Sequence, residues 1–264
     1  MKKYIAVFKT SWQNVLTYRF NFFVGQARNI IVLLLMYYIW TSLSFKTGNF
    51  GGYSIIELST YVFLVALLKP IIMGAQTRKI SEEINDGTFS KYLTMPVNYP
   101  LLVFFRELAE RSLYFIAALI ELIIFAFVIK ANIFFQSSGK YLFIFLISLI
   151  LANLLYFILT FFVSLLAFWS REAHGPRFLF EWTLEFTSGI FYPLDIIFPA
   201  LFLILTFLPF AYILFYPIMI YLGRVSDSAI IKILGMQLCW IILFSFIARH
   251  IWRKGLRNYS GEGI

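Results

Sequence analysis

Long apolar runs separated by short polar stretches dominate the pattern of this sequence. The runs cover residues 22–45, 54–76, 101–129, 141–169, 178–198 and 229–247. A helix needs about 20 apolar residues to cross the hydrocarbon core of a bilayer, which is roughly 30 Å thick, and each run has this length. The pattern therefore predicts an all-α membrane protein, one domain over residues 1–264 with six transmembrane helices.

The stretch from residue 178 to 222 is long enough for two crossings, but four prolines interrupt it, at positions 193, 199, 209 and 217. Basic residues decide how often it crosses, because lysine and arginine gather in cytoplasmic loops. They concentrate at residues 2–19, 78–111, 171–177 and 249–257 and are sparse in the other connections. One crossing at 178–198, followed by an outer re-entrant element at 199–224, keeps all four groups on one side. We therefore expect both termini in the cytoplasm.

The first 20 residues have a basic start, but Lys9 interrupts them before an apolar core of signal-peptide length develops. We interpret residues 1–20 as an amphipathic helix that lies along the cytoplasmic face of the membrane.

The composition supports this membrane assignment. Hydrophobic residues make up 61% of the 264 residues, charged residues make up 13%, and the mean hydropathy is +0.83, values that an ordinary soluble domain does not have. The net charge of +9 sits mainly at the ends of apolar runs, where it marks the cytoplasmic side. It does not indicate nucleic acid as a partner.

Motifs for chemistry are missing from the sequence. No phosphate-binding loop of the G-x-x-x-x-G-K-[ST] type occurs, His174 and His250 stand alone, and Cys239 is the single cysteine. We therefore expect no catalytic residue, no metal site and no bound cofactor on this chain.

Charged residues inside the apolar runs are costly and so are candidate functional residues. Glu121 lies deep in the run at 101–129, and Glu57 lies near the outer end of the run at 54–76. For Glu121 we consider either an internal pair or polar cavity lining, or a substrate or proton role in an ion-coupled carrier. The carrier alternative lacks an inverted repeat in the sequence. Four further charges are expected to pair between helices or reach the inner boundary: Arg28, Lys69, Glu181 and Glu185.

The cytoplasmic segment at residues 77–96 is the most polar internal part of the chain. We expect the helix of the run at 54–76 to continue into it and to stop at Asp86 and Gly87, since glycine favours the left-handed conformation that ends helices. A short amphipathic helix then carries Phe89, Tyr92 and Leu93 at helical spacing before Pro96 ends it. Exposed aromatic side chains on such a helix indicate a docking groove on a partner. The alternative is an ordinary solvated loop.

The stretch "ISEEINDGTFSKYLTMPVNYPLLVFFREL", residues 80–108, resembles the signature of the type-2 ABC transporter permeases. In that family an E-x-x-x-G-T run with following aromatic, leucine and proline positions comes after the second span. The N-terminal interfacial helix, six spans and proline-rich stretch before the last span agree along essentially the whole chain. The similarity is greatest to the subfamily in which two different permease chains are commonly made with one ATPase.

The resemblance implies an ATP-driven exporter rather than an enzyme: a dimer of permeases, identical or homologous, on two ATP-binding subunits that bind ATP and Mg²⁺. It implies a bacterial inner (plasma) membrane location and transport out of the cytoplasm or inner leaflet. Carried to this sequence, the acidic position is Glu83 or its neighbour Glu82, followed by Asp86, and the turn is Gly87 and Thr88. Residues 89–93 would be the coupling helix that enters the ATPase groove. The substrate is not identified by the sequence.

Overall fold

The computed structural model describes residues 2–17, 19–47, 49–170 and 174–259. Arg171, in the third basic group, lies outside them. The α-helices among these residues are α1 (Lys2–Thr17), α2 (Arg19–Thr47), α3 (Ile55–Ile72), α4 (Arg78–Asn85), α5 (Ser90–Thr94), α6 (Tyr99–Ile129), α7 (Gly139–Ser164), α8 (His174–Thr187), α9 (Pro199–Phe207), α10 (Phe215–Tyr221) and α11 (Asp227–Asn258). Three 3₁₀ turns and a small hairpin complete the elements: η1 (Leu165–Phe168), η2 (Leu194–Ile196), η3 (Phe210–Tyr212), β1 (Asn49–Phe50) and β2 (Tyr53–Ser54).

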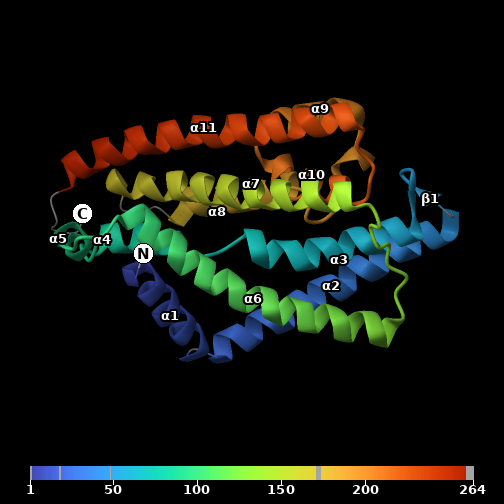
Figure 1. Ribbon diagram of the computed structural model, residues 1–264, viewed down its shortest axis with the longest axis horizontal. Helices are drawn as coiled ribbons and strands as arrows, with labels where there is room; N and C mark the ends of the chain where they lie inside the picture. The colour runs from blue at the N-terminus through green and yellow to red at the C-terminus, as the bar shows by residue number, and fades with distance from the viewer. Residues whose placement is uncertain (1, 18, 48, 171–173, 260–264) are drawn as a thin grey trace.

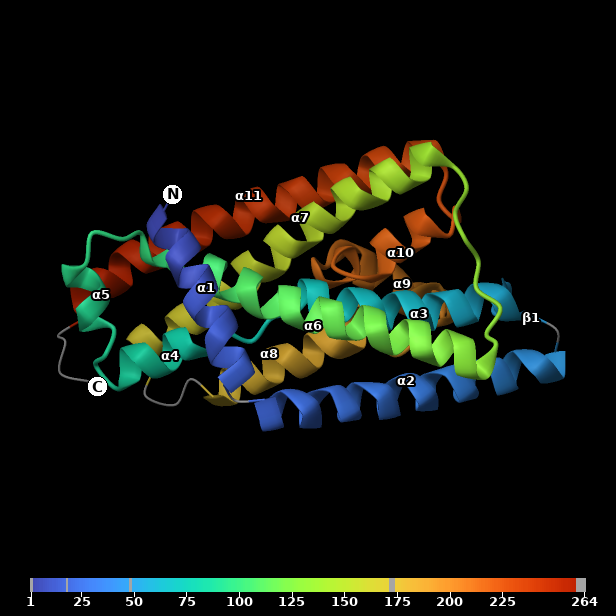
Figure 2. The same ribbon diagram turned by 60° about the horizontal axis from the view of Figure 1, so that its bottom comes forward.

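Five long helices, α2, α3, α6, α7 and α11, run lengthwise through an elongated bundle (Figure 1). Each is long and apolar enough to span a bilayer. Helices α4 and α5 lie at one end, which we call the inner end, and the β1–β2 hairpin lies at the other, the outer end (Figures 1 and 2). The start of α1 and the end of α11 also lie at the inner end. The predicted all-α membrane fold is confirmed.

Two of the predicted helices differ from the structure. The helix in the run at 54–76 ends at Ile72 and does not continue into α4, because Met73 has extended backbone. Pro70 lacks the N–H of a regular turn, and Gly74 lies against Glu107 of α6 so closely that a Cβ at Gly74 would overlap the carboxylate. The chain therefore leaves the helical path where α6 passes.

The predicted span at 178–198 is also too long. Helix α8 has 14 residues, about 21 Å at 1.5 Å per residue, which is less than the hydrocarbon thickness. The chain turns after it at Gly189, which has φ +89° and accepts a hydrogen bond from the buried Tyr61 hydroxyl. A side chain at Gly189 would meet Tyr61 and Phe215.

Helix α9 and the following segment, Phe210–Tyr221, are bent by 78° relative to each other. This bent pair occupies the stretch predicted as a re-entrant element. Backbone at membrane depth must be surrounded by protein, and Leu214, Ile218 and Ile220 are fully buried against the long helices. The Phe215 N–H also donates to the Ser188 carbonyl at 3.0 Å, which ties the pair to the end of α8.

Candidate functional site at the inner end

The turn between α4 and α5 is built by three of the predicted site residues. Gly87 adopts φ +76°, which only glycine adopts without strain. The Asp86 carboxylate accepts hydrogen bonds from the Thr88 hydroxyl at 2.6 Å and the Thr88 N–H at 2.9 Å, and these bonds hold the pKa of the Asp86 carboxyl below its usual value. The Phe89 N–H then donates to the Glu83 carbonyl at 2.7 Å. Asp86, Gly87 and Thr88 thus determine how the chain reverses.

Glu83 and Glu82 point in different directions. The Glu83 carboxylate pairs with Arg106 of α6 at 2.9 Å and accepts hydrogen bonds from the hydroxyls of Tyr92 and Tyr99. Arg106 also donates to the Tyr92 hydroxyl at 2.6 Å. Glu82, by contrast, is exposed. Glu83 therefore holds the segment to α6, whereas Glu82 faces outward.

Phe89 and Tyr92 are buried, so the prediction that they are exposed is wrong. Phe89 is 0% exposed, and its ring packs edge-on against four aromatic rings: Tyr99, Phe168, Trp252 and Tyr259, with centroids 4.8 to 5.8 Å away. Tyr92 is almost as deeply buried. The apolar face of α5 meets α6, η1 and α11 of its own chain. The spacing of the apolar residues predicts an apolar face on the helix. It does not show whether that face packs on its own chain or stays free for a partner.

The outward face of the segment is mainly polar. We call five of its exposed residues the inner tip: Glu82, Asp86, Thr88, Lys91 and Leu93. Leu93, from the predicted coupling helix, is 51% exposed. These side chains remain accessible to a partner at the inner end.

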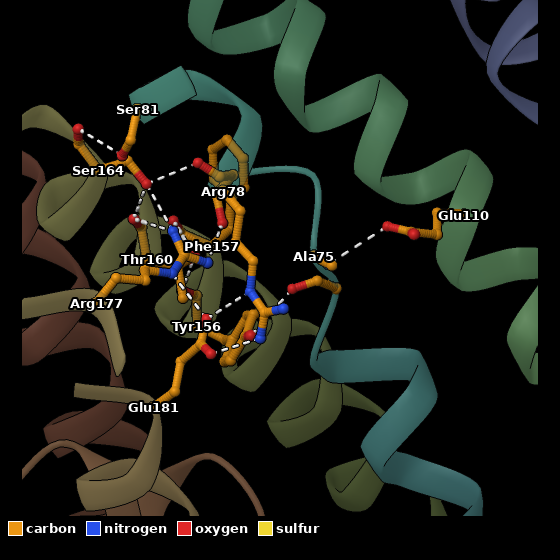
Figure 3. Close-up of polar contacts among 12 residues, drawn as sticks. Ala75, Arg78, Ser81, Glu110, Tyr156, Phe157, Thr160, Ser164, Arg177 and Glu181 are labelled. Atoms are coloured by element: carbon orange, nitrogen blue, oxygen red, sulfur yellow. Dashed lines mark hydrogen bonds and ion pairs between the residues drawn. The ribbon is translucent and has the colours of Figure 1, made fainter. Parts of the chain in front are cut away.

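A buried arginine network joins the base of the segment to the bundle. Arg177 of α8 donates to the hydroxyls of Ser164 at 2.6 Å and Thr77 at 2.8 Å and pairs with Glu181 at 2.8 Å. Both oxygens of the Glu181 carboxylate also accept from Arg78, the first residue of α4. Figure 3 shows these side chains converging from neighbouring helices. The network connects the start of α4 with α7 and α8.

Sequence reasoning did not single out Arg177 or Thr77 as functional residues. It did predict that charges in the apolar runs pair between helices, and the structure confirms this for Glu181 with Arg78 and for Lys69 with Glu185 at 2.8 Å. The available signal was the two glutamates four residues apart on one face of α8. Their partners could not be read from the pattern, because they lie on other elements.

A cavity of about 540 Å³ runs along α2, α3, α6 and α8. Charged residues, among them Arg28, Lys69 and Glu110, line one part of it. Glu121 also lines it and accepts a hydrogen bond at 2.8 Å from Gln26 of α2. The remaining lining is largely apolar and aromatic, with Leu33, Met36, Trp40, Tyr61, Val62 and Phe191. Its volume is within the range of small-molecule sites, about 300 to 1,000 Å³.

Glu57, the other predicted pathway residue, does not line this cavity. It forms a capping box with Ser54 at the start of α3 and an ion pair at 2.9 Å with Arg224. The Arg224 guanidinium also lies 3.8 Å from the centre of the Tyr53 ring. Glu57 therefore fixes the hairpin, α3 and the connection before α11 to one another at the outer end.

Comparisons with known proteins identify a family. A family model described as "ABC-2 family transporter protein" matches residues 28–263, which is most of the chain and includes the α4–α5 segment, nearly all of the cavity lining and the bent pair of α9 and Phe210–Tyr221. No curated protein and no solved structure matches the chain.

Proposed function

The chain belongs to the ABC-2 family of transporter proteins, and from this we propose that it is the membrane subunit of an ATP-driven exporter whose energy comes from a separate ATPase. Members of this family are membrane transport components, so the chain is a multi-pass permease of an ABC transporter. The proposal adds the direction of transport, the ATPase and the way in which the two are coupled.

The main observation in support of this proposal is the structure of the inner tip. It is exposed and charged, yet Phe89 and the Glu83–Arg106 pair fix it to α6 and α11. A rigid connection of this kind passes on a displacement instead of absorbing it. The Arg177 network would extend the same displacement to α8, which lines the cavity. We propose that two ATPase subunits, carrying ATP and Mg²⁺, press on the tips of two permease chains, identical or homologous.

The cavity supports a path for an apolar or amphiphilic substrate. It joins charged lining residues to aromatic and aliphatic ones, so a molecule with a polar head and an apolar body matches its walls. In the proposed orientation the inner end and both termini face the cytoplasm of a bacterial cell, and the substrate leaves the cytoplasm or the inner leaflet of the plasma membrane.

Exchanging two charges on the inner tip should separate the ATPase from the permease. In the double variant Glu82→Lys with Lys91→Glu the net charge is unchanged and no hydrogen bond of a buried side chain is removed. We expect at least a tenfold loss of the ATPase that co-purifies from the native membrane, because reversed charges across an interface repel. The measurement is the ATPase activity of the tagged permease preparation, with its subunits identified by mass spectrometry.

The matched control is the exchange Lys140→Glu with Asp227→Lys. This ion pair is exposed and lies away from the inner tip, and its exchange also conserves net charge. It should leave ATPase retention unchanged. Equal retention by the two double variants would count against docking at the inner tip.

One observation favours the alternative function, a proton- or ion-coupled carrier: Glu121 lines the cavity. Glu121→Gln discriminates between the two, because glutamine keeps an acceptor for the hydrogen bond from Gln26 but cannot bind a proton. For the exporter we expect ATP-dependent transport in proteoliposomes to stay within about threefold of wild type, since one neutral hydrogen bond is worth roughly 1 kcal/mol. Transport that is abolished in this variant and independent of ATP in the wild type would establish the carrier.

A further inference from the structure

A second hollow lies at the inner end of the molecule, separate from the cavity that α2 and α8 line. This inner groove has a volume of about 610 Å³ and lies between the α5–α6 connection, α7 and α11. On α11 it is lined by the small side chains of Ser245 and Ala248, and on α7 by Phe157 and Phe161. Ser245 and Ala248 leave space beside the phenyl rings of α7.

The groove straddles the expected boundary of the hydrocarbon core. The apolar run of α11 ends at Ile247, and Arg249 is the first charged residue after it. Ser245 and Phe157 therefore lie on the hydrocarbon side, whereas Tyr92 and Trp252 lie at the level of the head groups, where tyrosine and tryptophan are enriched in membrane proteins. A soluble partner would reach only part of such a groove, but a lipid could occupy its whole length.

Basic residues lie at the rim of the groove and beyond it along α11. Arg249 lines it, and Arg253 and Arg257 follow at intervals of four residues on the same face of α11, with Lys254 beside them. All four are exposed, and α11 contains no acidic residue after Asp227. Among the residues that the structure describes, none of the four forms an ion pair. Arg249 at the rim therefore offers a positive charge that no carboxylate among the described residues neutralises.

We propose that the inner groove binds an anionic phospholipid of the inner leaflet. An acyl chain would lie along Ser245 and the phenyl rings of α7, and the phosphate would meet Arg249 at the rim. Basic pockets between helices on the cytoplasmic side suit such head groups. The lipid would also cover Met95, which is half exposed and lines the groove. This site is independent of the proposed transport path, since no lining residue is shared.

Quenching of Trp252 fluorescence tests the proposal. The permease is purified with the subunits it retains and is titrated with phosphatidylglycerol or phosphatidylcholine whose chains are brominated. A Trp252→Phe variant supplies the signal of the other tryptophans. We expect phosphatidylglycerol to bind about fivefold more tightly, the ratio that follows from about 1 kcal/mol for one basic residue at an anionic surface.

Three variants locate the site. Arg249→Gln should abolish the preference for phosphatidylglycerol, whereas Arg257→Gln, which removes the same charge outside the groove, should retain most of it. Ser245→Phe fills the groove and should remove the quenching of Trp252 by both lipids. If that variant misfolds, as judged by gel filtration, the comparison of Arg249→Gln with Arg257→Gln decides alone.

Other results would overturn the proposal. Equal affinity for the two lipids would contradict the proposal. So would an equal loss of the phosphatidylglycerol preference in Arg249→Gln and Arg257→Gln, because it would indicate only a general attraction of the basic helix to an anionic membrane surface. Loss of quenching when the ATPase is present, with recovery after its removal, would show that a protein covers the groove.

Discussion

Replacing Phe89 by alanine should release the α4–α5 segment from the bundle. The side chain is fully buried among the rings of Tyr99, Trp252 and Tyr259, and truncation of a buried phenylalanine costs about 3–5 kcal/mol. We expect faster cleavage by trypsin at Lys79 and Lys91, which are exposed, and a midpoint of thermal unfolding lower by on the order of 10 °C. In the proposed exporter, ATP hydrolysis should continue without transport, because a loose segment cannot transmit a displacement.

Leu93→Ala is the control for this variant. Leu93 lies on α5, which Phe89 caps, but Leu93 is half exposed, and surface substitutions usually change stability by about 0.5 kcal/mol or less. Trypsin resistance and unfolding should therefore stay close to wild type. If Phe89→Ala were as resistant to trypsin as Leu93→Ala, the aromatic cluster would not be what fixes the segment.

Replacing Arg177 by methionine should destabilise the junction of α4, α7 and α8. The Arg177 side chain is 7% exposed, bonds Thr77 and Ser164 and pairs with Glu181. A hydrogen bond that involves a charged group contributes about 1.5–3 kcal/mol, and Glu181 keeps Arg78 as a partner in this variant. The hydroxyl of Thr77, which is buried, would also lose its donor. We expect a thermal midpoint lower by on the order of 10 °C and weaker coupling of ATP hydrolysis to transport.

Arg78→Met provides a matched comparison, because Arg78 binds the same carboxylate. Its side chain is 57% exposed, and an exposed ion pair is worth about 0–1 kcal/mol. The change in the unfolding midpoint should therefore be several times smaller than for Arg177→Met. Equal losses in the two variants would mean that burial does not decide the strength of this network, and that Arg177 is not the residue that joins α4 to α8.

The α4–α5 segment shows how much of the structure the local sequence pattern can predict. Its position after the second span and its turn at Asp86 and Gly87 follow from local preferences, and the structure has the turn there. The contacts of Phe89 and Glu83 do not follow from local preferences. Their partners on α6 and α11 are far away in the sequence, and a short amphipathic helix has the same pattern whether its apolar face meets its own chain or another.

The helix ends show the same limit. The runs that became α2, α6, α7 and α11 were recognisable because a bilayer requires long apolar helices. The early ends of α3 and α8 depend on contacts of glycines: Gly74 with Glu107, and Gly189 with Tyr61 and Phe215. Apolar composition continues past both points, so hydropathy alone extended the helices too far.

The sequence by itself determined that this is a membrane protein, and also its helical class, its family and the position of its most polar segment. Each of these depends on composition, on the length of the apolar runs or on a local turn. Only the tertiary structure decided which side chains of that segment are anchors and which are free, where α3 and α8 end, and which residues line the cavity. The physical reason is that these features come from close packing and ion pairing between helices that are distant in the chain. Such contacts do not alter the periodic pattern of apolar and polar residues in either helix.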